Sequence, residues 1–183
     1  MIVFAGRLAP HKGVAEMVEA LRLVVDRGHD VAMIVVGSGL PDVTIDDRLE
    51  QQAAALELSD RVILLRKFVE TDEMVEYLAA ADACCFPSSH EAYGFIALEA
   101  MAVGVRSVVG PGFADDVVGR FRGTCVHTRT IDPVELADAY ELVLDPTQQP
   151  DMAQIAQEFA LHEHNWESAA RNTIEAYREI VRG

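Results

Sequence analysis

The chain has few lysines, few cysteines and no long apolar run, and each shortage excludes a class of protein. Its only lysines are Lys12 and Lys67, and the formal net charge of −15 argues against nucleic acid or an anionic membrane as a partner. No apolar run reaches the length of a membrane span, and no signal peptide is visible at the N-terminus. The cysteines (Cys84, Cys85 and Cys125) lack metal or disulfide spacing, so we interpret them as small buried residues and expect a cytoplasmic protein.

The motifs of several enzyme classes are missing as well. The Gly37-Ser38-Gly39 turn resembles the start of a dinucleotide fingerprint but lacks the third glycine, so we exclude a hydride-transferring dehydrogenase. We interpret this turn as one that keeps the backbone close to a ligand. A P-loop is absent, which argues against nucleotide hydrolysis. His90 neighbours Glu91, but no serine elbow or second histidine has the spacing of a nucleophile triad or a metal cluster.

Short apolar runs alternate with helical patterns along most of the chain, and half of the 183 residues are hydrophobic. This alternation predicts an α/β fold, a doubly wound parallel sheet of Rossmann-like topology in a single domain. The expected strands are Ile2–Ala5, Val31–Val36, Val62–Leu65, Ala83–Phe86, Ser107–Val109 and Thr124–His127. The expected helices run from Val14 to Val25, near Arg48 to Leu56, from Asp72 to Ala81 after a Thr71 cap with Met74, Val75 and Leu78 inward, and from Asp132-Pro133 with Leu136, Tyr140 and Val143 on one side.

The segment S-S-H-E-A-Y-G-F-I-A-L-E-A-M-A-V-G places two carboxylates, Glu91 and Glu99, on either side of a glycine turn that opens a helix. Gly94 allows the tight turn and a close approach of the backbone to a ligand. The free amides of Phe95 and Ile96 then point at whatever lies at the helix N-terminus, a natural site for phosphate. Two acceptors around an anion site suit a phosphate between two hydroxyl-rich groups, the shape of a nucleotide-sugar.

A second group of candidate residues follows the first expected strand. Gly6 and Arg7 come directly after it, and Lys12 lies five residues beyond Arg7. A guanidinium and an ammonium at the carboxyl end of a strand can clamp a diphosphate. Ligands of doubly wound sheets bind at this edge, so we expect these residues beside the glycine turn.

The ordered motifs G-R-L-A-P-H-K-G, V-G-S-G and P-S-S-H-E-A-Y-G-F-I-A-L-E-A-M-A-V-G resemble the C-terminal domain of family 4 retaining glycosyltransferases (glycosyl transferases group 1). The resemblance implies one half of a GT-B fold, the half that binds the nucleotide-sugar donor. It implies that Arg7 and Lys12 hold the diphosphate and neutralise the leaving group, that Glu91 contacts the transferred sugar and that Glu99 binds ribose. It also implies catalysis without a metal or cofactor. The implied donor-binding set is Gly6, Arg7, Lys12, Gly37, Gly39, Arg66, Glu91, Gly94, Phe95, Ile96 and Glu99.

Three positions depart from the pattern of the family. The segment from Gly104 to Val109 lacks the usual proline. The loop Gly110–Asp116 replaces a double-glycine loop ending in glutamate and is about two residues shorter than that loop, with Asp116 nearest the usual acid. Arg66 stands where a glycine usually lies beside the nucleobase. These departures indicate an unusual donor or reduced activity.

The sequence divides into a nucleotide-sugar-binding region, residues 1–146, and two C-terminal helical stretches, residues 147–183. We expect the latter to pack on the domain or to cross to an N-terminal acceptor domain, in cis or in trans, because the resemblance implies such a half and it is missing before the first strand. The chain would then be an excised domain or a split subunit that binds donor but scarcely turns over alone. The alternative is a non-catalytic module that docks a partner through its last helix. A phosphorylase or epimerase is disfavoured because its acid–base or cofactor residues are not identifiable. The nucleotide base, the sugar, the acceptor and the oligomeric state stay open.

Overall fold

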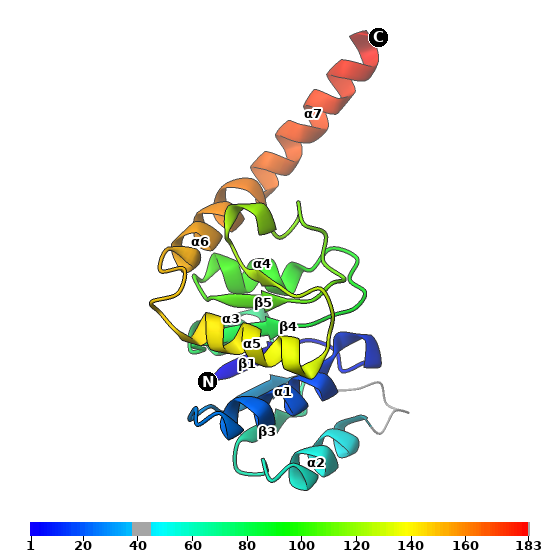
Figure 1. The fold of residues 1–183 in the computed structure, drawn as a ribbon. Helices are drawn as coiled ribbons and strands as arrows, with labels where there is room; N and C mark the ends of the chain where they lie inside the picture. The colour runs from blue at the N-terminus through cyan, green and yellow to red at the C-terminus, as the bar shows by residue number, and fades with distance from the viewer. Residues whose placement is uncertain (38–44, 183) are drawn as a thin grey trace.

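A computed structural model describes residues 1–37 and 45–182, and shows a six-stranded, wholly parallel sheet with helices on both faces (Figure 1). The strands follow the order β3-β2-β1-β4-β5-β6, so the chain starts in the middle of the sheet and builds outward twice. Their bounds are β1 Ile2–Ala5, β2 Met33–Val36, β3 Val62–Leu65, β4 Ala83–Phe86, β5 Ser107–Val109 and β6 Val126–His127. The expected doubly wound, Rossmann-like fold is confirmed.

The helices form two layers. On one face α1 packs against α2 and α5, and on the other α4 packs against α3 and α6. Their bounds are α1 Val14–Asp26, α2 Ile45–Ala55, α3 Thr71–Ala79, α4 Phe95–Ala102, α5 Pro133–Leu144, α6 Met152–Glu163 and α7 Trp166–Arg182. Two layers of helices explain why the central strands are apolar at every position: all four residues of β1 and of β4 are buried.

The ends of two strands differ from the expectation. We expected β2 to begin at Val31, but it begins at Met33, because Met33 is the residue that pairs with Ile2 at the start of β1. We expected β6 to begin at Thr124, but only Val126 and His127 pair with β5. Thr124 instead turns its hydroxyl to the carbonyl of Val118, inside the preceding loop. Both segments are apolar enough for the sequence to predict longer strands, but pairing with the neighbouring strand sets where each one begins.

The start of α3 also corrects the sequence prediction. Thr71 is the first helical residue and not the cap, because the Glu70 carbonyl accepts the first helical hydrogen bond, from the Met74 amide at 2.9 Å. Val75 was expected inward but is exposed, whereas Leu78 is buried and Met74 packs against the core as predicted. The buried side of α3 therefore follows the four-residue spacing from Met74 to Leu78 and does not include Val75.

The expectations for α5 and for the cysteines are confirmed, whereas α2 begins at Ile45, before the expected Arg48, and α3 ends at Ala79, before the expected Ala81. Asp132 caps α5 by accepting a hydrogen bond from the Val134 amide at 2.8 Å, and Leu136, Tyr140 and Val143 are buried on one side of the helix. The three cysteines are also buried.

The two C-terminal helices have different surroundings. α6 packs on α4, whereas α7 extends away from the sheet (Figure 1). Of the residues in α7, Trp166, Ile174, Tyr177 and Ile180 are large, apolar and exposed. Across the described ranges, no helix combines the length and the hydrophobicity that crossing a membrane requires.

Candidate functional site

The loops after β1 and β2 meet at the carboxyl edge of the sheet with almost no space between them. The Gly6 amide donates to the Val36 carbonyl at 2.9 Å, and the Gly37 amide donates to the Leu65 carbonyl at 3.1 Å. A Cβ atom on Gly37 would overlap the carbonyl oxygen of Gly6. Backbone packing therefore requires a glycine at Gly37. This structural reason is additional to the ligand-binding reason that we predicted. Gly39 lies outside the described residues.

The loop after β1 brings Lys12 to Glu91. The Ser89 amide donates to the carbonyl of His11 at 2.9 Å, which ties this loop to the one after β4. Gly13, in the left-handed region at φ 71°, then packs on Pro87. As a result the Lys12 Nζ lies 2.5 Å from Glu91 Oε2, and both side chains are more than four-fifths buried. Two residues that the sequence places 79 positions apart thus form one ion pair.

The glycine turn opens α4 as predicted. Gly94 takes φ 91° and ψ 40°, a left-handed conformation that favours glycine. The first helical hydrogen bonds run from the amides of Ala97 and Leu98 to the Gly94 carbonyl. The amides of Phe95 and Ile96 therefore precede the helical ladder and have no carbonyl one turn earlier to bond. Together with the partial positive charge of the helix N-terminus, they are available to an anion.

Glu99 lies apart from this ion pair. It stands one turn into α4 and lines a groove of about 880 Å³ that α4 forms with the junction of α6 and α7. Tyr93, Phe95 and Trp166 supply aromatic walls to the same groove. Desolvation in this position raises the pKa of Glu99 above its ordinary value.

The two arginines of the predicted site have different surroundings. Arg7 is exposed at the end of β1 and forms no ion pair with any other residue of the described ranges. Arg66, at the end of β3, pairs with Asp47 at 3.2 Å and with Glu50 at 2.7 Å, both on α2. The charge of Arg66 is thus balanced from within the protein, whereas Arg7 presents its guanidinium to solvent.

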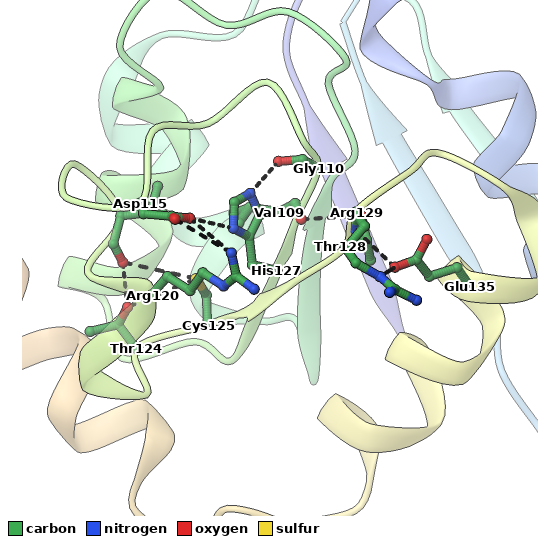
Figure 2. Close-up of polar contacts among 11 residues, drawn as sticks. Val109, Gly110, Asp115, Arg120, Thr124, Cys125, His127, Thr128, Arg129 and Glu135 are labelled. Carbon is green, nitrogen blue, oxygen red and sulfur yellow. Dashed lines mark hydrogen bonds and ion pairs between the residues drawn. The ribbon is translucent and has the colours of Figure 1, made fainter.

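A polar cluster that the sequence analysis missed lies behind the loop after β5 (Figure 2). Asp115 in this loop contacts His127 at the end of β6 and Arg120, with Nδ1 of His127 2.9 Å from the carboxylate and the Arg120 Nη1 3.3 Å from it. His127 also donates from Nε2 to the Gly110 carbonyl at 2.8 Å. The only sequence signal was the departure of this loop from the family pattern, which gives no indication of the histidine.

The fold defines a Rossmann-like domain whose strand order reverses between the neighbouring strands β1 and β4, and the loops after these two strands carry Lys12 and Glu91. Comparison with known proteins makes the assignment specific: the model of the family described as glycosyl transferases group 1 matches residues 1–172, and the chain belongs to that family. The resemblance found in the motifs is thereby confirmed. Membership does not favour the alternative of a non-catalytic docking module.

Individual relatives agree with the family. The chain is 32% identical to a D-inositol 3-phosphate glycosyltransferase of Corynebacterium urealyticum over 98% of this chain and 43% of the relative. It is 28% identical to an uncharacterized glycosyltransferase of Methanocaldococcus jannaschii over 97% of this chain and 44% of the relative. The chain therefore spans less than half the length of these relatives.

Solved structures show the same fold. The C-terminal domain of a glycosyl transferase group 1 family protein (LpcC) from Francisella tularensis has a TM-score of 0.79 at 22% identity, covering 90% of this chain and 85% of that one. Anabaena Alr3699/HepE, solved in complex with UDP and glucose, has a TM-score of 0.79 at 24% identity, covering 97% of this chain and 47% of that one.

Proposed function

We propose that this chain is the donor-binding part of a retaining glycosyltransferase that takes a sugar from a nucleotide-diphosphate sugar. The observation that carries the proposal is the buried Lys12–Glu91 pair beside the free N-terminal amides of α4. A cation and helix amides attract a diphosphate, and a carboxylate accepts hydrogen bonds from sugar hydroxyls. The UDP and glucose bound by the Anabaena structure support this ligand class.

The proposed chemistry assigns a role to each end of the site. The bond between the anomeric carbon and the diphosphate oxygen breaks through an oxocarbenium-like transition state, and a bond forms from an acceptor hydroxyl oxygen to the same face of that carbon. Negative charge develops on the leaving diphosphate, which takes the proton of the acceptor hydroxyl. Lys12, Arg7 and the amides of Phe95 and Ile96 stabilise that charge because they are positioned before the reaction. Glu91 faces the transferred sugar. We assign this stabilisation to side chains and amides, and propose a reaction that needs neither a metal nor a cofactor.

The remaining predicted residues have supporting places in the proposal. Gly6 and Gly37 bring backbone to the donor, and Glu99 accepts hydrogen bonds from ribose hydroxyls along α4. Arg66 lies towards the nucleobase, and its pairing with α2 reduces the charge that it offers to the donor.

The whole reaction also needs an acceptor-binding half, which we propose is supplied in cis or in trans. The exposed apolar residues of α7 support a partner on that helix. Because positioning of both reactants supplies much of the rate, we expect the chain alone to bind donor with little transfer. We place the protein in the cytoplasm, which the three buried, unpaired thiols support.

Calorimetric titration with UDP-glucose, GDP-mannose and ADP-glucose tests the proposal. We expect one of the three to bind the wild type and to lose at least tenfold in affinity in Lys12→Ala, about the 1.5–3 kcal/mol that a hydrogen bond to a charged group contributes. Arg61→Ala is the matched control, since it also removes one cation. Arg61 pairs with Asp30 and directly precedes β3, so it lies at the amino edge of the sheet, opposite the proposed site. Absence of binding to all three donors, or equal losses in the two variants, would contradict the donor site.

A further inference from the structure

We propose that His127 is a positioning residue for the donor site: its ring, held between Gly110 and Asp115, fixes the loop after β5 against the turn that carries Glu91. This inference rests on the proposed function, because it concerns the geometry of the same site. It adds a residue outside the predicted donor set, at the carboxyl end of β6.

The His127 ring contacts both ends of this loop. Nε2 lies 2.8 Å from the Gly110 carbonyl, which can only accept a hydrogen bond, so Nε2 carries a proton. Nδ1 is buried and lies 2.9 Å from the Asp115 carboxylate, a short polar contact without an aligned hydrogen bond. The side chain is only 8% exposed, so the ring is enclosed between these two partners.

The Asp115 carboxylate contacts a second side chain besides the ring. The Arg120 Nη1 lies 3.3 Å from the carboxylate that faces His127. The Cys125 thiol next to this cluster is neutral near pH 7, since burial raises its pKa to about 11. One carboxylate therefore links His127 and Arg120 (Figure 2) and holds both against the loop after β5.

The loop after β5, which His127 holds, packs its backbone against the backbone of the turn from Ser88 to Gly94. The Gly110 amide donates to the Phe86 carbonyl at 3.0 Å, and the Gly112 amide donates to the Ser88 carbonyl at 2.9 Å. A Cβ on Gly112 would come within 2.5 Å of the His90 amide nitrogen, and one on Gly94 would overlap the ring of Phe113. The loop after β5 thus supports the whole of this turn, from Ser88 to the start of α4.

This packing connects the histidine to the chemistry. A donor site works only when its groups keep the productive geometry to within about 0.5 Å, and supporting contacts provide that precision. Loss of the imidazole ring releases Gly110 and Asp115, both ends of the loop, and allows the turn from Ser88 to Gly94 to shift. Glu91 and the helix amides then meet the donor less well, although the fold and the Lys12 pair persist.

The test compares three variants with the wild type in donor titrations at one pH. His127→Gln keeps a hydrogen-bond donor for Gly110 but lacks the imidazole, and His127→Ala removes both contacts. His29→Gln is the control, because His29 is an exposed histidine that pairs with Glu141 on α5.

We expect the affinity of His127→Ala for the donor to be lower than that of the wild type by roughly fivefold or more, the low end of couplings between linked sites. We expect His127→Gln to lie between the two, because it keeps the hydrogen bond to the Gly110 carbonyl. Unchanged affinity in both His127 variants, with donor bound by the wild type, would overturn the inference.

Hydrogen exchange separates this failure from that of the proposed function. The Gly112 amide, bonded to Ser88, should exchange faster in His127→Ala than in the wild type, without any ligand. If this occurs while the wild type binds none of the three donors, the loop is anchored as described but the donor role is wrong. If exchange at Gly112 is unchanged, His127 does not hold the loop and the inference is overturned.

Discussion

Gly94→Ala is expected to destabilise the protein more than an alanine at any open glycine of similar conformation. Gly94 has φ 91°, and a left-handed conformation costs an alanine about 1–2 kcal/mol. The new methyl group would also overlap the ring of Phe113, which is 4% exposed and has little room to move. Overpacking of this kind costs about 1–3 kcal/mol, so we expect a total loss of about 2–5 kcal/mol.

Gly28→Ala isolates the backbone part of that loss. Gly28 follows α1 with φ 95°, almost the value of Gly94, and an added Cβ there meets no heavy atom within 4 Å. The entropy that alanine removes from the unfolded chain is the same at both sites. The difference between the two variants is therefore the clash with Phe113, and it should be about 1–3 kcal/mol.

Equilibrium urea unfolding measures the difference, provided that the slope m is the same for both variants. In a double-mutant cycle, Phe113→Ala should remove the extra cost of Gly94→Ala, because space then replaces the ring. Donor titration gives a second readout, since a shifted Phe113 or α4 N-terminus disturbs the anion site and Gly28 lies far from it in the sequence. Equal losses for Gly94→Ala and Gly28→Ala would refute the packing argument.

Two further predictions concern buried polar groups. Tyr140→Phe should stabilise the protein by about 1 kcal/mol in urea unfolding. The fully buried hydroxyl has no hydrogen-bond partner of good geometry in the described part of the chain, and the Cys85 thiol near it is a weak partner. A loss of stability would show that the contact with Cys85 matters. Burial, and then the positive charge of Arg122, lower the pKa of His164, whose neutral Nδ1 lies 3.0 Å from the Tyr93 hydroxyl. The folded state therefore binds fewer protons at this site than the unfolded state, so this contribution is complete above about pH 6.5 and is lost as pH falls below that value. His164→Asn should flatten this part of the stability profile between pH 7 and 5, and an unchanged profile would show that His164 does not titrate as described.

Much of the fold could be predicted because its signals are local or follow from chain path. β1 and β4 are apolar at every residue, which only a strand buried on both faces allows, and alternation with helices then forces parallel pairing. Parallel strands place all their carboxyl ends at one edge, so Lys12 and Glu91 could be expected near each other without any knowledge of their contact.

What could not be predicted depends on contacts between distant side chains. Whether Arg66 faces a ligand or an acidic partner is decided by Asp47 and Glu50, on a helix whose rotation the sequence does not specify. His127 ends a short strand and shows no motif, and its role depends on a carboxylate twelve residues earlier. The prediction for the inward face of α3 was wrong at Val75 for a similar reason, since Val75 is as apolar as Met74 and Leu78 and only the packing of the helix leaves it exposed.

The acidity of the chain and the anionic ligand that we propose are compatible because the two act over different distances. At physiological ionic strength, charges further than about 8 Å from the site are largely screened, so the net charge of −15 has little effect at the anion site itself. In the ion pair the charges of Lys12 and Glu91 offset each other. Positive charge then comes from the exposed Arg7 and from the N-terminus of α4, which carries about half an elementary charge. The ion pair still contributes to binding, because an ammonium has three donors and one contact with Glu91 leaves others for phosphate. Glu91 therefore holds Lys12 in place before the donor binds, and the same carboxylate can accept hydrogen bonds from the transferred sugar.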